Sequence, residues 1–168
     1  MKIHSGWIAA ALLLSVVLAC NLSKNGNNSN NSNNSNSNKN KNENTSKAPT
    51  TNRPANAEVY VERIYMASDS NGDPGDETSS YEPADHKVHC LIELNKAKKG
   101  TQIRFVWKAI DVEGEKNKEI KTTEYSTNSF ENKVHGHLTL PYDWPKGSYR
   151  VEVYINGNLD KTIDYTIG

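Results

Sequence analysis

Hydrophobic and polar residues alternate along the last third of the chain, and this alternation predicts a β-hairpin. Every second side chain from Tyr149 to Ile155 is apolar, which is the period of a strand with one buried face. A second alternating run extends from Leu159 to Ile167. Asn156-Gly157 lies between the two runs, and this dipeptide favours the positive φ angles of a tight type I′ turn.

The same period recurs upstream and predicts five further strands, at residues 57–66, 88–94, 103–109, 120–126 and 134–140. The segment 120–126 is polar, which is typical of an edge strand. We expect residues 67–84 to form a long loop. No stretch shows an amphipathic helical period of useful length. Seven short strands separated by regularly spaced turns predict an all-β chain that folds as an antiparallel sandwich.

Four residues of this domain resemble the Cys–Trp–Tyr-x-Cys pattern of the immunoglobulin fold: Cys90, Trp107, Tyr149 and Val151. Val151 stands where the second cysteine would be, so the resemblance implies that the disulfide is lost and that Cys90 packs as an apolar side chain against Trp107. The segments 81–85 and 144–157 also resemble recurrent elements of immunoglobulin-like domains in bacterial envelope proteins. The resemblance implies a seven-stranded immunoglobulin-like sandwich over residues 57–168, and it specifies fold far better than function.

The N-terminal residues predict export from the cytoplasm. Lys2 precedes a short apolar run from Trp7 to Leu18, which fits a signal peptide better than a transmembrane helix. Val17-Leu18-Ala19-Cys20 resembles the lipobox of bacterial lipoproteins, which implies a signal peptide of residues 1–19 and acylation of Cys20, including palmitate. The alternative is an ordinary signal peptide followed by an incidental cysteine. The resemblance places the protein, lipid-anchored, on a cell membrane or outer membrane and facing away from the cytoplasm.

Residues 20–56 have the composition of a flexible linker. Asn, Ser and Lys dominate this segment after Cys20 and aromatic residues are absent, so it cannot bury enough apolar surface to offset its chain entropy. We expect a disordered tether between the lipid and the domain. The formal net charge of the whole chain is zero, so no global field favours nucleic acid as a partner.

Three histidines form the first candidate site. His89 alternates with Val88 and Cys90, and His135 and His137 alternate with apolar residues of the fifth expected strand. The second and fifth strands of an immunoglobulin sandwich are sheet neighbours, so these imidazoles could share one exposed patch suited to Zn²⁺ or Cu²⁺. The alternative is three solvated polar residues, because the strand pattern places no carboxylate or cysteine beside them.

An acidic segment forms the second candidate site. Carboxylate and amide oxygens recur at close spacing in the expected loop, and Ca²⁺ prefers such ligands. The spacing begins like an EF-hand loop, but Pro74 replaces its glycine and Ser80 its bidentate glutamate. A solvated loop without metal is the alternative. The possible calcium ligands are Asp69, Asn71, Asp73, Asp76 and Glu77.

No motif in the sequence points to catalysis. There is no Gly-x-Ser-x-Gly elbow and no phosphate-binding glycine loop, and Cys90 is expected to point into the core. Tyr154 is expected to face away from the core and could contribute to a protein-binding surface, although single exposed tyrosines on strands are common.

We therefore expect a non-catalytic binding or assembly module of the cell envelope, anchored in the membrane through the lipid on Cys20 and contacting another envelope protein. The alternatives are a metal-binding surface lipoprotein and an accessory or inhibitor-like domain that acts on an envelope enzyme. No resident cofactor is expected apart from the possible Zn²⁺, Cu²⁺ or Ca²⁺.

Overall fold

The computed structural model describes residues 47–168, which form ten strands. Within this range there is no helix with the length and apolar character needed to cross a membrane. The strands are β1 (Thr50–Thr51), β2 (Val61–Ser70), β3 (Asp73–Glu77), β4 (Ser80–Tyr81), β5 (Lys87–Leu94), β6 (Gln102–Val112), β7 (Glu115–Ser126), β8 (Lys133–Thr139), β9 (Gly147–Ile155) and β10 (Asn158–Ile167).

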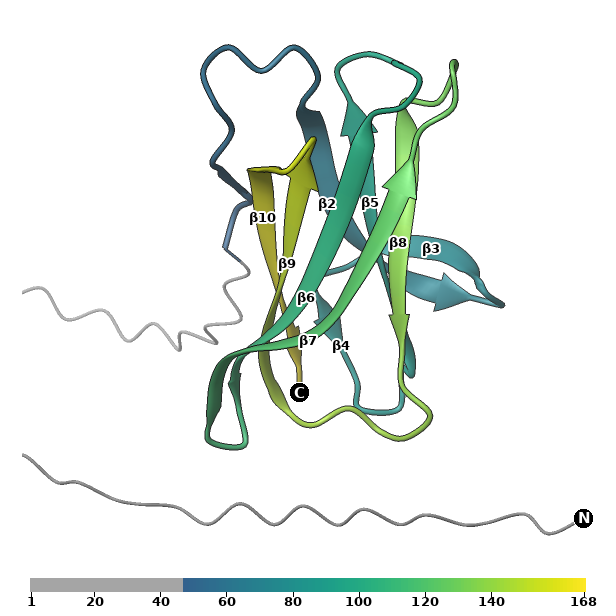
Figure 1. The fold of residues 1–168 in the computed structure, drawn as a ribbon. Coiled ribbons are helices and arrows are strands. Elements are labelled where there is room, and N and C mark those ends of the chain that lie inside the picture. Colours follow the sequence, from purple (N-terminus) through teal and green to yellow (C-terminus); the bar gives the residue numbers. More distant parts are fainter. Residues whose placement is uncertain (1–46) are drawn as a thin grey trace, which may run out of the picture. The chain divides into compact units, whose positions relative to one another are not determined.

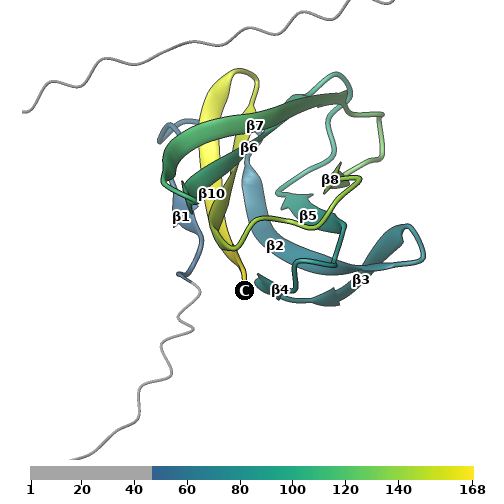
Figure 2. The same ribbon diagram turned by 90° about the horizontal axis from the view of Figure 1, so that it is seen from below.

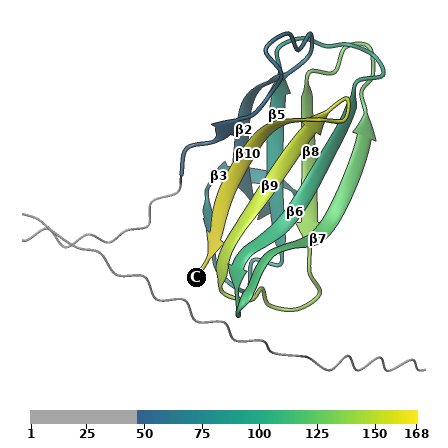
Figure 3. The same ribbon diagram turned by 60° about the vertical axis from the view of Figure 1, so that its left-hand side comes forward.

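The strands form two sheets that pack face to face (Figures 1 and 3). One sheet has the order β3-β2-β5-β8, and all of its pairs are antiparallel. The other has the order β1-β10-β9-β6-β7, and the short β4 adds a parallel pair to β10. The polar segment expected at a sheet edge is β7, which is indeed the last strand of its sheet.

This arrangement is an immunoglobulin-like sandwich. The strands β2, β5 and β8 occupy the positions of A, B and E in one sheet, and β6, β9 and β10 those of C, F and G in the other. The expected all-β, seven-stranded fold is confirmed, since each of the seven expected strands is present. Three short strands, β1, β3 and β4, are additional.

The residues that carry the immunoglobulin resemblance lie in the core between the sheets. Cys90, Trp107 and Val151 are fully buried and belong to one cluster, in which Cys90 is a free thiol. Tyr149 stacks on Tyr165, and its hydroxyl donates a hydrogen bond to the carbonyl of Pro145 at 2.6 Å. This bond is a tyrosine corner, which fixes the entry of the chain into β9.

The expected loop at residues 67–84 is wrong for most of its length, because it contains the end of β2 and the strands β3 and β4. Strand β2 continues to Ser70, turns at Asn71-Gly72 with positive φ at both residues, and returns as β3. The view from below shows this hairpin projecting beyond β5 and β8 (Figure 2). The polar residues on both of its faces hide the strand period, but the Asn-Gly turn is the usual signal for such a hairpin.

The N-terminal predictions fall mainly outside the described residues. The signal peptide, Cys20 and most of the linker precede residue 47. The final part of the segment assigned to the linker is described, and within it β1 pairs with β10 through Thr50 and Thr51. The Arg53 guanidinium lies 4.0 Å from the centroid of the Tyr60 ring.

Candidate metal centre

Two neighbouring strands position the three histidines. In the β5–β8 pair His89 lies opposite His137, and Leu91 lies opposite His135. Residues two apart on a strand point to the same side, so His135 and His137 share one face of β8. Val134, Gly136 and Leu138 alternate with them and are buried, which fixes the histidines on the outer face.

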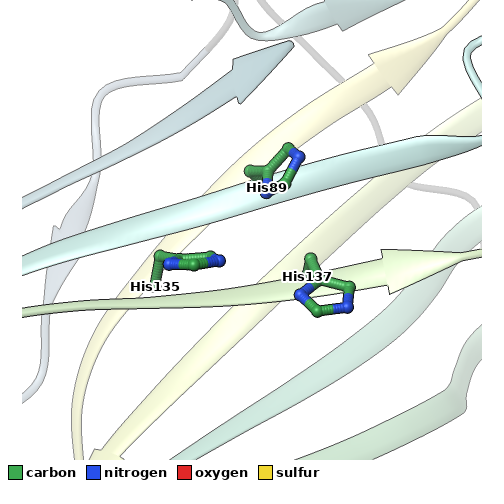
Figure 4. A group of neighbouring side chains, drawn as sticks. All are labelled: His89, His135 and His137. Carbon is green, nitrogen blue, oxygen red and sulfur yellow. The ribbon is translucent and has the colours of Figure 1, made fainter. Parts of the chain in front are cut away.

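The three imidazoles lie close enough to share a metal ion (Figure 4). Their ring centroids are separated by 5.7 Å for His89–His135, 5.9 Å for His89–His137 and 6.0 Å for His135–His137. One nitrogen from each ring lies within 4.8 Å of the other two. Two ligand nitrogens of a tetrahedral zinc ion are about 3.4 Å apart, a separation that rotation of the exposed rings can reach. Among residues 47–168 this is the only group of three or more His, Cys, Asp or Glu with such spacing.

His89 differs from the sequence-based expectation because its side chain is completely buried. It was expected in an exposed patch, but its exposed fraction is 0%. Its Nε2 lies 2.9 Å from Oδ1 of Asp69, at the end of β2. The β2–β3 pairing shifts register between Ala67 and Asp69, and such a bulge bends the strand. The sequence pattern placed no carboxylate beside the histidines, yet the hairpin brings one there.

The contact with Asp69 fixes which nitrogen of His89 can bind a metal. The hydrogen bonds from His89, Gly72 and Lys87 hold the pKa of Asp69 below its ordinary value, so this carboxylate is ionised and can only accept. In the neutral imidazole that donates to this carboxylate, the proton sits on Nε2 and Nδ1 carries the free lone pair. His89 Nδ1 is buried and has no hydrogen-bond partner among the described residues. Metal-binding histidines are commonly oriented in this way by a carboxylate.

His135 and His137 are in the protonation state that a metal requires. Burial lowers the pKa of both, and the nearby cations Lys87 and Lys121 lower that of His137 further, whereas the charge of Asp73 acts in the opposite direction on His135. Both imidazoles are therefore neutral at neutral pH and offer a lone pair without first losing a proton. The arrangement as a whole can bind an ion that prefers nitrogen ligands, such as Zn²⁺ or Cu²⁺.

The possible calcium ligands are distributed along the β2–β3 hairpin. Asp69 interacts with His89, while Glu77 accepts a hydrogen bond from Arg63 at 2.6 Å. Asn71 forms the turn, Asp73 pairs with Ser70, and the backbone carbonyl of Asp76 accepts a hydrogen bond from Ser68. The structure therefore links the two candidate sites, since one residue of the acidic segment supports a residue of the histidine cluster.

The last candidate, Tyr154, lies half-buried on β9. Its hydroxyl donates a hydrogen bond to Glu152 at 3.0 Å, and the Arg104 guanidinium lies 4.3 Å from the centroid of its ring. Its polar and aromatic parts are therefore both engaged within the domain.

The sequence pattern does not indicate that Asp69 lies beside the histidine cluster. The contact joins residues 20 positions apart through a bulged hairpin. Two signals were present in the sequence, the Asn71-Gly72 turn and an aspartate two residues before it. Neither of these two signals indicates which face of the sheet the hairpin covers, so neither predicts the contact between Asp69 and His89.

Comparisons with known proteins do not assign the chain to a family. No protein-family model matches the chain, and no curated protein matches it. Among solved structures it is similar to an immunoglobulin-like protein from Pseudomonas aeruginosa, with 15% sequence identity and a TM-score of 0.49. The match covers 68% of this chain and 100% of that one.

Proposed function

We propose that this protein binds a divalent transition-metal ion, Zn²⁺ or Cu²⁺, through His89, His135 and His137. The observation that carries the proposal is the state of His89: its imidazole is fully buried, one nitrogen is bonded to Asp69, and the other has no partner. A buried polar atom without a hydrogen bond costs about 1–3 kcal/mol, and coordination to a metal removes this cost. If His135 and His137 were only solvated surface residues, nothing would require a buried His89 with one nitrogen left unpaired beside them.

The proposal includes the cellular setting expected from the sequence. The lipobox-like residues that end in Cys20 support a lipid-anchored protein on the outer side of a bacterial membrane, where the domain would meet extracytoplasmic metal. The immunoglobulin-like domain serves as a rigid, non-catalytic scaffold for the ion. Another envelope protein as partner stays a prediction.

Isothermal calorimetry with Zn²⁺ and with Cu²⁺ tests the metal site. The full chain carries Cys20→Ser in every sample, so that this thiolate cannot bind the metal. We expect one ion per chain, and an affinity at least tenfold lower in His89→Ala and in His137→Ala. Asp69→Asn should lower the affinity about 10–100-fold, the usual effect of losing a residue that orients a ligand.

His86→Ala is the matched control. His86 is exposed, bonds to Asp143 at 2.9 Å and lies outside the cluster. Its removal should leave the affinity unchanged. Absence of binding to the parent protein, or an equal loss in His86→Ala and His137→Ala, would reject the proposed function.

A further inference from the structure

We infer that the ion held by the three histidines keeps one coordination position open to solvent, and that this position takes a small anion from solution. The inference rests on the proposed function and concerns the ligand that the site would take. The inference depends on how many metal ligands the protein supplies, on which side of the ion these ligands lie, and on the charges around the ion.

The donors lie on one side of the ion. His89 is completely buried, whereas His135 and His137 on the same face are exposed. An ion bound to all three nitrogens therefore has the sheet beneath it and solvent above. Zinc takes four ligands, and a site with three protein ligands leaves the fourth position to water or another small ligand.

Asp69 cannot supply the fourth ligand while it holds His89. Its Oδ1 accepts the His89 Nε2 hydrogen and lies 3.3 Å from the Lys87 ammonium. Its Oδ2 accepts a hydrogen bond from the backbone amide of Gly72 at 3.1 Å. Both oxygens are engaged. The two nitrogens of an imidazole also point in different directions, so an ion at Nδ1 is separated from Asp69 by the width of the ring.

Asp73 is the remaining carboxylate to consider. It lies near enough for its charge to act on His135, but it is exposed and outside the compact group of three histidines. If the protein supplied the fourth ligand, Asp73 would be that ligand, and the ion would then have no position open to an anion.

The charges around the site favour an anion over a neutral ligand. Three neutral imidazoles leave the full double charge on the ion, and this charge dominates the local field. The negative charge of Asp69 is balanced by Lys87, with which it forms an ion pair. Lys121, from β7 of the other sheet, adds a positive charge that acts on His137 and offsets the negative charge of Asp73, which acts on His135. A monodentate anion would therefore be attracted to the open side.

Visible spectroscopy of the Co²⁺-loaded full chain tests the inference, with azide as the probe. Co²⁺ replaces zinc with similar geometry, and its absorption changes when one of its ligands is exchanged. We expect a saturable spectral change corresponding to one azide per cobalt. Lys121→Gln should weaken azide binding about two- to fivefold, as expected for one exposed charge, with little change in Co²⁺ affinity. His86→Ala should behave as the parent protein.

The outcomes separate this inference from the proposed function. Failure to bind Co²⁺, Zn²⁺ or Cu²⁺ rejects the metal site itself. Binding of Co²⁺ with a spectrum that a large excess of azide leaves unchanged rejects only the open position. A response to azide that appears only after Asp73→Asn would also reject it, because the protein would then supply the fourth ligand.

Discussion

Two aspartates of this domain show how strongly one residue type depends on its surroundings. Asp69 accepts hydrogen bonds from His89 and Gly72 and lies beside Lys87, and these donors lower its pKa. Asp160 is 2% exposed, and burial raises its pKa although the backbone amide of Val61 donates to it. Asp69 is thus stabilised in the ionised form that orients His89, whereas ionisation of Asp160 opposes folding.

We predict that Asp160 lowers the stability of the domain as pH rises. Its pKa is higher in the folded state than in the unfolded chain, so the folded state binds more protons between these two values. Its favourable contribution is complete below the unfolded pKa, about 3.9, and is lost as pH rises through the folded pKa. Asp160→Asn keeps an acceptor for Val61 and removes the charge. The variant should therefore gain stability relative to the parent between pH 3 and pH 7.

Urea unfolding at both pH values measures this gain. Asp160→Ala is the comparison, since it also removes the charge but leaves the Val61 amide buried without a partner, and it should be less stable than Asp160→Asn by about 1–3 kcal/mol at either pH. A difference in unfolding free energy between Asp160→Asn and the parent that does not change with pH would contradict the prediction.

At the scale of elements, strand β8 joins the core to the metal site. Its residues alternate strictly between exposed and buried, with the two histidines on one face and Gly136 between them on the other. A Cβ atom added at Gly136 would lie 3.0 Å from two atoms of the Phe105 ring. The glycine therefore lets β8 approach the core closely, and this approach sets the position of both histidines.

Gly136→Ala should destabilise the domain by about 1–3 kcal/mol, because the added methyl group overpacks a close contact. It should also weaken metal binding, since β8 must move away from β6. Thermal unfolding and calorimetry measure the two effects. Thr139→Ala, on the exposed face of the same strand, is the control and should stay within about 0.5 kcal/mol of the parent. The double variant Gly136→Ala/Phe105→Leu should recover part of the stability; no recovery would contradict the assigned contact.

The elements that the sequence predicts well are those with one buried face. The alternation in β8, in β9 and in residues 163–167 of β10 reflects a core on one side and solvent on the other, so periodicity alone identifies them. The β2–β3 hairpin has largely polar residues on both faces, and periodicity misses it. The burial of His89 could not be predicted for the same reason, since it depends on where that hairpin packs. The strand period is enough to indicate that His135 and His137 are exposed, whereas it does not indicate the burial of His89.

At the scale of the whole molecule, the two cysteines have separate roles. Cys90 is fully buried in the sandwich, and burial raises the pKa of its thiol well above the ordinary value. Such a thiol is a poor nucleophile and is inaccessible in the folded domain. Cys20 lies outside the described residues, at the end of the segment that resembles a lipobox. Only Cys20 therefore has a sequence context that would accept a lipid.

The proposed lipid anchor gives the last prediction, which concerns where the protein resides. In a bacterial host that supplies the lipoprotein pathway, the parent chain should fractionate with membranes and incorporate a clickable palmitate analogue. Cys20→Ser should abolish labelling, because it removes the thiol that accepts the acyl chains. It should also release the protein from the membrane, because the short apolar segment before residue 20 cannot replace two acyl chains as an anchor. Cys90→Ala is the matched control: it removes the other thiol and should leave labelling and fractionation unchanged. Labelling that persists in Cys20→Ser, or is lost in Cys90→Ala, would show that the acyl group is not carried by Cys20 and that the lipobox resemblance is incidental.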